Sequence, residues 1–167
     1  TGANNLGKGM IDGDILLNLD SEEDGEICMG CAGGVGTHAV FTFTPAPAPA
    51  DYKYLEIIFK DFQGGHSGCD IHLERACANK LVMRFINNIM KENDVKIASI
   101  DFGDKHNAIA IKATITIGVN ADAYDSIIAQ LAEFEAIIKN EYKNTEKDLK
   151  VLSNVVDTPA NVIDDCS

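Results

Sequence analysis

Residues 55–89, LEIIFKDFQGGHSGCDIHLERACANKLVMRFINNI, contain a change from strand-like to helix-like spacing of apolar side chains. Near the start, Leu55, Ile57 and Phe59 occupy alternate positions, which predicts a strand with one strongly apolar face. Further on, apolar residues recur at helical spacing, at Ile71, Ala78, Val82, Phe85 and Ile89. The two patterns meet at residues 64–68, Gly-Gly-His-Ser-Gly, where the glycines allow a tight turn that a Cβ atom would obstruct.

The position of His66 depends on where that helix begins. Ser67 and Asp70, three residues apart, fit a capping box, which predicts a helix starting at Gly68. His66 would then lie just before the cap, on a rigid corner, with its ring free to point away from the core. A surface histidine without a role and a functional histidine both fit this pattern.

The segments on either side complete a fold. Alternation of apolar residues is clearest over residues 109–119, and a second strand is predicted from Ala98, Ile100 and Phe102. A last strand is predicted around residues 149–155. A second helix is predicted after a cap at Asn120 or Asp122, with an apolar stripe at Tyr124, Ile127, Ile128, Leu131, Phe134, Ile138 and Tyr142.

This order of elements predicts the fold class. Residues 52–156 run strand, helix, strand, strand, helix, strand, which is typical of an α+β, ferredoxin-like split βαβ fold. We therefore expect a four-stranded antiparallel sheet with both helices on one face. Extra N-terminal strands are predicted over 13–20 and 38–44, and residues 45–50, with three prolines, are predicted to be an extended connector.

Asp20 is another candidate functional residue, because it ends the predicted strand 13–20. A carboxylate at the C-terminal end of a strand is a common metal ligand or catalytic acid in α/β proteins. Cys28 and Cys31 have CxxC spacing, but there is no second pair at zinc-finger distance, so a closed zinc site is not supported. His106 and Asn107, at the start of the 109–119 strand, are also candidates, although both are ordinary turn residues.

Composition limits the class of partner. The chain of 167 residues is 46% hydrophobic, so it can form one domain with a core. Its net charge of −12 argues against nucleic acid, and no apolar run approaches the ~20 residues of a membrane span. Five cysteines, an odd count, favour reduced thiols and a cytoplasmic location.

Several motifs together resemble one family. They are GGHSGCDIHL at 64–73, RACANKL at 75–81, NAI at 107–109, GDILLNLDSEE at 13–23 and MGCAGG at 29–34. This combination resembles the lid, or dimerisation, domain of bacterial Xaa-His dipeptidases. These enzymes, also called aminoacylhistidine dipeptidases, are carnosinase-like zinc exopeptidases that hydrolyse the amide bond before a C-terminal histidine.

The resemblance implies roles for three residues. Asp20 would be a zinc ligand of a catalytic domain that holds two zinc ions. His66 would stabilise the oxyanion that develops on the dipeptide substrate, in many members within the partner subunit's site, so its ring would lie outside the core and make few hydrogen bonds within its own chain. Asn107 would contact substrate. It also implies a cytoplasmic homodimer formed through the lid.

The chain departs from the family in two ways. The family motif continues Asn-Ala-Ile-Pro-Arg, where this chain has Ala110 and Ile111. The family's His-x-Asp ligand motif, its Glu-Glu pair with the general base and its late histidine ligand are missing from the 167 residues. We therefore expect this chain to be an excised piece or a remnant of such an enzyme. It would be inactive alone, and it would not hold zinc by itself. Residues 1–20 would be a strip of the catalytic domain and residues 21–167 the lid.

Two other hypotheses remain open. The chain could be a non-enzymatic binding or oligomerisation module on a ferredoxin-like scaffold, in which His66 is merely structural. A weaker alternative is a metal-binding protein that uses the cysteines and the acidic residues 20–26.

Overall fold

The computed structural model describes residues 5–15, 17, 24–27, 29–30, 35–103 and 105–163. It divides into two compact units, Thr1–Val40 and Phe41–Ser167. The α-helices and the main sheet lie in the second unit. No helix in the described part of the chain is both long and apolar enough to cross a membrane.

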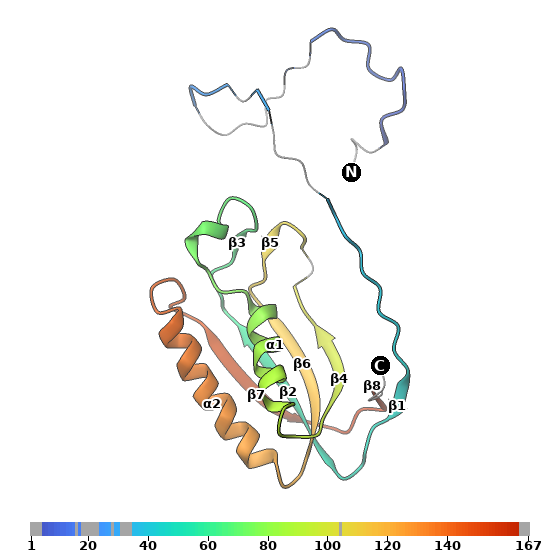
Figure 1. Ribbon diagram of the computed structural model, residues 1–167, viewed down its shortest axis with the longest axis vertical. Coiled ribbons are helices and arrows are strands. Elements are labelled where there is room, and N and C mark those ends of the chain that lie inside the picture. The colour runs from blue at the N-terminus through green and yellow to red at the C-terminus, as the bar shows by residue number, and fades with distance from the viewer. Residues whose placement is uncertain are drawn as a thin grey trace. The chain divides into compact units, whose positions relative to one another are not determined.

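The centre of the second unit is a four-stranded antiparallel sheet (Figure 1). Its strands are β2 (Tyr52–Lys60), β4 (Val95–Asp101), β6 (Ala113–Asn120) and β7 (Lys150–Val156). They are ordered β4-β6-β2-β7, so the first and third strands of the chain order lie inside and the other two form the edges. This is the strand order of the split βαβ arrangement and confirms the predicted fold class.

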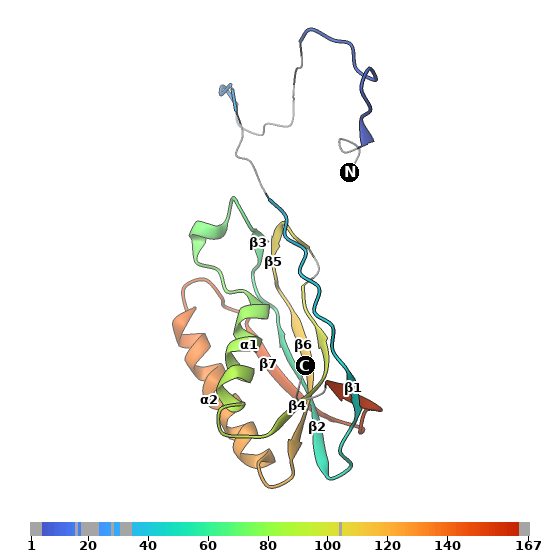
Figure 2. The ribbon, with the colours of Figure 1, turned by 45° about the vertical axis from the view of Figure 1, so that its right-hand side comes forward.

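Both α-helices, α1 (Ala78–Ile89) and α2 (Tyr124–Glu141), cover the same face of the sheet (Figures 1 and 2). The alternate residues of the inner strands meet the apolar stripes of the helices in one core. The core side chains with no exposure are Ile57, Phe59, Ala76, Ala78, Val82, Ala113, Ile115, Ile117, Val119, Ile127 and Ile138. The predicted apolar faces of β2, of β6 from Ala113 to Val119 and of α2 are therefore confirmed, whereas Ile111 of the predicted 109–119 face is exposed.

The first helix begins later than predicted. It starts at Ala78, not Gly68, and residues 67–77 form a loop that contains the 3-10 helix η2 (Ile71–Leu73). The predicted capping box is not formed, because both side chains have other partners. The hydroxyl of Ser67 donates to the carbonyl of His106 at 3.5 Å, and the carboxylate of Asp70 accepts from the backbone N–H of His66 at 2.8 Å.

The predicted strand 109–119 is divided in two. β5 (Ala108–Ile109) pairs with β3 (Gly65–His66) in a small separate sheet, and β6 begins only at Ala113. Between them, the carbonyl of Ala110 accepts from the N–H of Ala78 at 2.9 Å, which anchors the start of α1. The backbone of Ala110 therefore hydrogen-bonds to the start of α1 and does not continue the strand.

Two smaller predictions about the elements need correction. A bulge between Ile97 and Ser99 interrupts β4, so Ala98, Ile100 and Phe102 do not line one buried face: Ile100 is 46% exposed, whereas Phe102 packs against the core. Neither predicted cap is the N-cap of α2, which is Ala123 without a side-chain cap. Asn120 instead accepts from the N–H of Asp122 at 3.1 Å.

The predicted N-terminal strand over 38–44 is wrong. Those residues are exposed and in no strand. Of the predicted strand 13–20, the described residues 13–15 and 17 are not in a strand either, and the others lie outside the described residues. The proline-rich connector contains a short strand, β1 (Pro45–Pro47), which pairs with β8 (Asn161–Ile163) in a two-stranded sheet.

Candidate functional site

His66 and Asn107 come together at the small sheet of β3 and β5. His66 is paired with Ala108, and the N–H of Ser67 donates to the carbonyl of Asn107 at 2.9 Å. Both His66 and Asn107 are exposed, so both are open to a ligand. Asp20, the third predicted site residue, lies outside the described residues.

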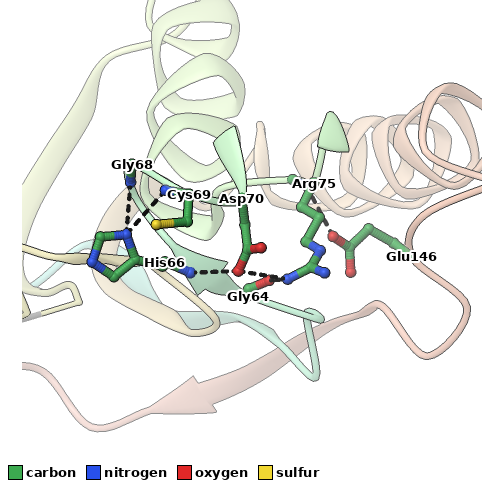
Figure 3. A network of polar contacts seen from close by, with 8 residues as sticks. Gly64, His66, Gly68, Cys69, Asp70, Arg75 and Glu146 are labelled. Atoms are coloured by element: carbon green, nitrogen blue, oxygen red, sulfur yellow. Dashed lines mark hydrogen bonds and ion pairs between the residues drawn. The ribbon is translucent and has the colours of Figure 1, made fainter. Parts of the chain in front are cut away.

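The His66 ring is held by two backbone donors (Figure 3). Its Nδ1 atom accepts from the N–H groups of Gly68 and Cys69, each at 3.1 Å. A nitrogen that accepts cannot carry a proton, so this geometry assigns the ring to the neutral tautomer with hydrogen on Nε2. The ring lies outside the core as predicted, but the expectation of few hydrogen bonds within its own chain was wrong.

The backbone of His66 is fixed by Asp70. The Oδ2 atom of Asp70 accepts from the N–H of His66 at 2.8 Å, and the N–H of Asp70 donates to the carbonyl of His66 at 3.0 Å. Arg75 connects the two ends of the turn: its Nη1 atom lies 3.3 Å from the same Oδ2 and donates to the carbonyl of Gly64 at 2.6 Å. These contacts form the network of Figure 3.

The two glycines before His66 are required by this geometry. Gly64 has φ +67°, and a Cβ atom there would overlap the Ile111 side chain. Gly65 has φ +148°, and a Cβ atom there would overlap the Arg75 guanidinium. The predicted tight turn is confirmed, and both positions exclude other residues through backbone conformation and space.

A small recess of about 220 Å³ lies beside β3 and β5. Its walls are mainly apolar and include one charged side chain; they consist of Gly65, Gly103, Lys105, Ala108, Ile109, Ala110 and Ile111. It includes Ala110 and Ile111, the two positions that depart from the family motif. A volume of this size suits one side chain and is smaller than a typical drug-sized ligand site.

Sequence reasoning did not assign three further residues to this site. The sequence pattern assigns Asp70 to a helix cap and includes Arg75 in a motif without a role of its own. No pattern indicates a role for Glu146. Asp70 and Arg75 stood within the GGHSGCD and RACANKL motifs, so their closeness to His66 was a usable signal. Glu146 lies 80 residues beyond His66, and no spacing rule relates the two.

The described residues contain no group of three histidine, cysteine, aspartate or glutamate side chains that could hold a metal ion. Cys69 and Cys77 are free thiols. Cys28 and Cys31 lie outside the described residues. Within that part of the chain, the site consists of a fixed imidazole, an exposed amide and a small apolar recess.

Residues 59–146, which contain both α-helices, β4, β6 and the loop around His66, match the family model described as the M20 peptidase dimerisation domain. The chain belongs to this family.

Two relatives agree with this assignment. The dimerisation domain is 38% identical over 155 residues to the cytosol non-specific dipeptidase of Escherichia coli K12, covering 93% of this chain and 32% of that protein. It matches the crystal structure of aminoacylhistidine dipeptidase from Vibrio alginolyticus with a TM-score of 0.72 and 31% identity, covering 75% of this chain and 26% of that one. The chain thus spans between about a quarter and a third of the length of these relatives.

A more distant structure shares the fold alone. An amidase of the hydantoinase/carbamoylase family from Burkholderia multivorans matches with a TM-score of 0.51 at 15% identity, covering 67% of this chain and 28% of that one. At this identity the similarity concerns the arrangement of strands and helices, and it carries no argument about chemistry.

Proposed function

We propose that this dimerisation domain is the lid of a zinc-dependent dipeptidase that hydrolyses Xaa-His dipeptides, and that His66 is its catalytic contribution. The observation that carries the proposal is the fixed ring of His66, whose Nδ1 accepts two backbone N–H groups. The dipeptidases among the relatives, and the motifs around His66, support this substrate class.

The chemistry follows from the tautomer. With Nδ1 occupied, Nε2–H is the ring's only donor, and it lies on an exposed corner. A neutral donor held in place before reaction stabilises the negative charge that develops on the carbonyl oxygen of the scissile amide. Closure of the lid would exclude water around that oxygen and strengthen the interaction.

Zinc, when bound by the complete enzyme, would supply a Lewis acid and activate the attacking water. Asp20 would be this chain's ligand, since a carboxylate oxygen suits zinc. The described residues do not supply the other ligands, so we expect the chain alone to be inactive toward dipeptides. Incubating it with β-alanyl-histidine and excess zinc tests this, and turnover abolished by a chelator would contradict it.

Asn107 would bind substrate beside His66, because the pairing of β3 with β5 brings the two residues together. The neighbouring recess would accept an apolar part of the dipeptide, given its mainly apolar walls. Ile111 cannot supply the charge of the family's arginine, so a substrate carboxylate would need another cation.

The remaining proposals concern the whole protein. Residues 1–20 would belong to the catalytic domain and residues 21–167 to the lid. The protein would be a cytoplasmic homodimer formed through the lid, so that His66 can reach the partner subunit's site. Neither nucleic acid nor a membrane would be a partner, in keeping with the net charge of −12.

The test is His66→Ala in the complete enzyme, with His72→Ala as the matched control. His72 is an exposed histidine of η2, six positions further along the same loop. We expect His66→Ala to lower kcat by roughly 10²–10³, as loss of one oxyanion donor does. The free energy of unfolding should change by only about 0.5 kcal/mol, as for other surface changes.

His72→Ala should leave both quantities near their original values. A His66→Ala variant that keeps its specific activity but unfolds readily would contradict the proposal. It would favour the alternative of a non-enzymatic module in which His66 is structural.

A further inference from the structure

Glu146 is a buried carboxylate, 5% exposed, that follows the end of α2. Both of its oxygens accept hydrogen bonds from backbone N–H groups. Oε2 accepts from Gln63 at 2.7 Å, and Oε1 accepts from Ala76 at 2.9 Å. Charged hydrogen bonds of this length are the strong ones in proteins.

The two donors stand at opposite ends of the His66 loop, which we define as residues 64–75. Gln63 is the last residue before it and Ala76 the first after it. One carboxylate therefore fastens both ends of the loop to the turn after α2. The hydroxyl of Thr145, the residue before Glu146, adds a contact of 3.4 Å to the carbonyl of Glu74. Figure 3 shows Glu146 approaching the backbone next to Arg75.

The loop has few other anchors to the rest of the fold. Its large apolar side chains are exposed to solvent, Ile71 by 66% and Leu73 by 38%. Apolar burial therefore contributes little to fixing the loop on the rest of the fold. The side chains of Asp70 and Arg75 hydrogen-bond within residues 64–75, to His66, to Gly64 and to each other, so they shape the loop without fixing its position. The pairing of β3 with β5 and the hydrogen bonds of Ser67 to His106 and Asn107 hold the loop near its start. Glu146 holds the two ends of the loop together.

We propose that Glu146 is a positioning residue for His66: its two hydrogen bonds set the base of the loop and so the place where Nε2–H points. This rests on the proposed function of His66. Glu146 itself acts only through the backbone of Gln63 and Ala76. Misplacement of a catalytic group by about 1 Å can lower the rate 10²-fold. A change in the position of Gln63 or Ala76 that displaces the His66 ring would therefore lower the rate.

The test is Glu146→Gln in the 167-residue chain, with Glu141→Gln as the matched control. Glutamine has the same shape, but only its oxygen can accept, and its NH₂ group would face one of the two N–H donors. Glu141 is an exposed carboxylate of the same helix end, paired with Arg84. The probes are the imidazole ¹⁵N signals of His66 and the exchange rates of the Gly68 and Cys69 amides.

We expect Glu146→Gln to move the His66 signals from the single Nε2–H tautomer toward an average of both tautomers. The two amides should exchange at least about tenfold faster, while amides of β2 and β6 keep their rates. A global loss of stability would accelerate the strands as well. Glu141→Gln should change none of these signals, and an unchanged His66 spectrum in a folded Glu146→Gln variant would overturn the proposal.

Should Glu146→Gln fail to fold, native-state exchange on the unaltered chain decides the matter. If Glu146 sets the loop, the amides of Gln63 and Ala76 open together with those of Gly68 and Cys69, at a lower free energy than the strands. Free exchange of Gly68 and Cys69 while Gln63 and Ala76 stay protected would overturn the proposal.

Activity of the complete enzyme separates this inference from the proposed function. Glu146→Gln should lower kcat by about 10- to 100-fold with a smaller change in KM. If His66→Ala leaves kcat unchanged, the proposed function fails, whatever the spectra of Glu146→Gln show. If His66→Ala lowers kcat and Glu146→Gln does not, the positioning role alone fails.

Discussion

The helix-covered sheet and the His66 loop are stabilised by different forces. In the sheet, inner-strand residues such as Ile57 and Ile117 have no exposure and pack under both helices. In the loop, Ile71 and Leu73 face solvent, and the chain is held by the carboxylates of Asp70 and Glu146 and by the Arg75 guanidinium. Apolar burial is non-directional, whereas these hydrogen bonds fix individual atoms.

This difference suggests that the fold and the site can be altered separately. Removing apolar volume from the core should lower the free energy of unfolding without moving the His66 ring in the molecules that remain folded. Removing a hydrogen bond that holds the loop should move the His66 ring with a smaller loss in the free energy of unfolding. Four substitutions, taken from the largest expected effect to the smallest, test how far the separation holds.

Phe134→Ala tests the core. The Phe134 ring is 5% exposed, and its centroid lies 5.5 Å from that of Phe85 and 6.2 Å from that of Phe59. Truncation removes buried area and leaves a cavity between α1, α2 and β2, so we expect a loss of about 3–5 kcal/mol in the free energy of unfolding. Urea unfolding measures it.

The control for Phe134→Ala is Ile137→Ala on the same helix, where the side chain is 42% exposed. Its cost should be about 1 kcal/mol or less, because little area is lost from the core. The His66 signals of folded Phe134→Ala should match those of the unaltered chain. A shifted His66 spectrum there would show that core and loop are coupled.

The sequence was a good guide to the sheet for the same physical reason. Alternation at Leu55, Ile57 and Phe59, and the helical stripe from Ile127 to Ile138, report directly which face is buried. Burial of that face dominates the energy of these elements, so periodicity alone predicted their order and their sides. The strand predicted over 38–44 failed because alternation gives a face but not a partner strand.

The loop was harder to predict, because its contacts are specific and partly distant in sequence. Ser67 and Asp70 have the residue types and spacing of a capping box, and only the competing partners, the carbonyl of His106 and the N–H of His66, exclude it. Motifs identified His66 and Asn107. The tautomer of His66 and the role of Glu146 depend on atoms that no periodicity describes.

Gly65→Ala tests the loop at the residue before His66. A Cβ atom would overlap the Arg75 guanidinium and lie 2.6 Å from Asp70 Oδ2, at φ +148°, where side chains are strained. We expect a loss of roughly 1–3 kcal/mol in the free energy of unfolding and a displaced His66 ring. Chemical denaturation and the His66 ¹⁵N signals measure the two effects.

Gly68→Ala is the control for Gly65→Ala. Its added Cβ would lie 3.4 Å from atoms of the His66 ring, an ordinary contact, so stability should change by about 0.5 kcal/mol or less. Equal effects of the two substitutions would show that the loop tolerates a side chain at Gly65. The overlap with Arg75 would then be relieved by movement of that flexible side chain.

Asp70→Asn removes a charge from the network around His66. The carboxylate accepts from the N–H of His66 and lies 3.3 Å from Arg75 Nη1, with a side chain that is 32% exposed. Asparagine keeps one acceptor oxygen but loses the attraction to Arg75, so we expect a loss of about 1 kcal/mol. The His66 signals should shift by less than in Gly65→Ala, and a larger shift would place the control of the ring in this pair.

The smallest effect is expected from Glu141→Gln, which removes an exposed link between the two helices. Arg84 of α1 and Glu141 of α2 form a bidentate pair with two contacts of 2.7 Å, and their side chains are 43% and 38% exposed. Solvent screens such a pair, so it should contribute only about 0.5 kcal/mol at neutral pH.

The pH dependence of this pair has a definite sign. The hydrogen bond from Arg84 lowers the pKa of Glu141 below its usual 4.5 in the folded chain. Its stabilisation is therefore fully present above the unfolded pKa and is lost as the pH falls through the lower folded pKa. The unaltered chain should exceed Glu141→Gln in stability at pH 7, and the difference should vanish in acid and shrink in about 1 M salt. If the stability difference between the two chains persists in acid, Glu141 stabilises the helices by packing and not by its charge. Apolar burial would then account for this helix contact as it does for the rest of the core.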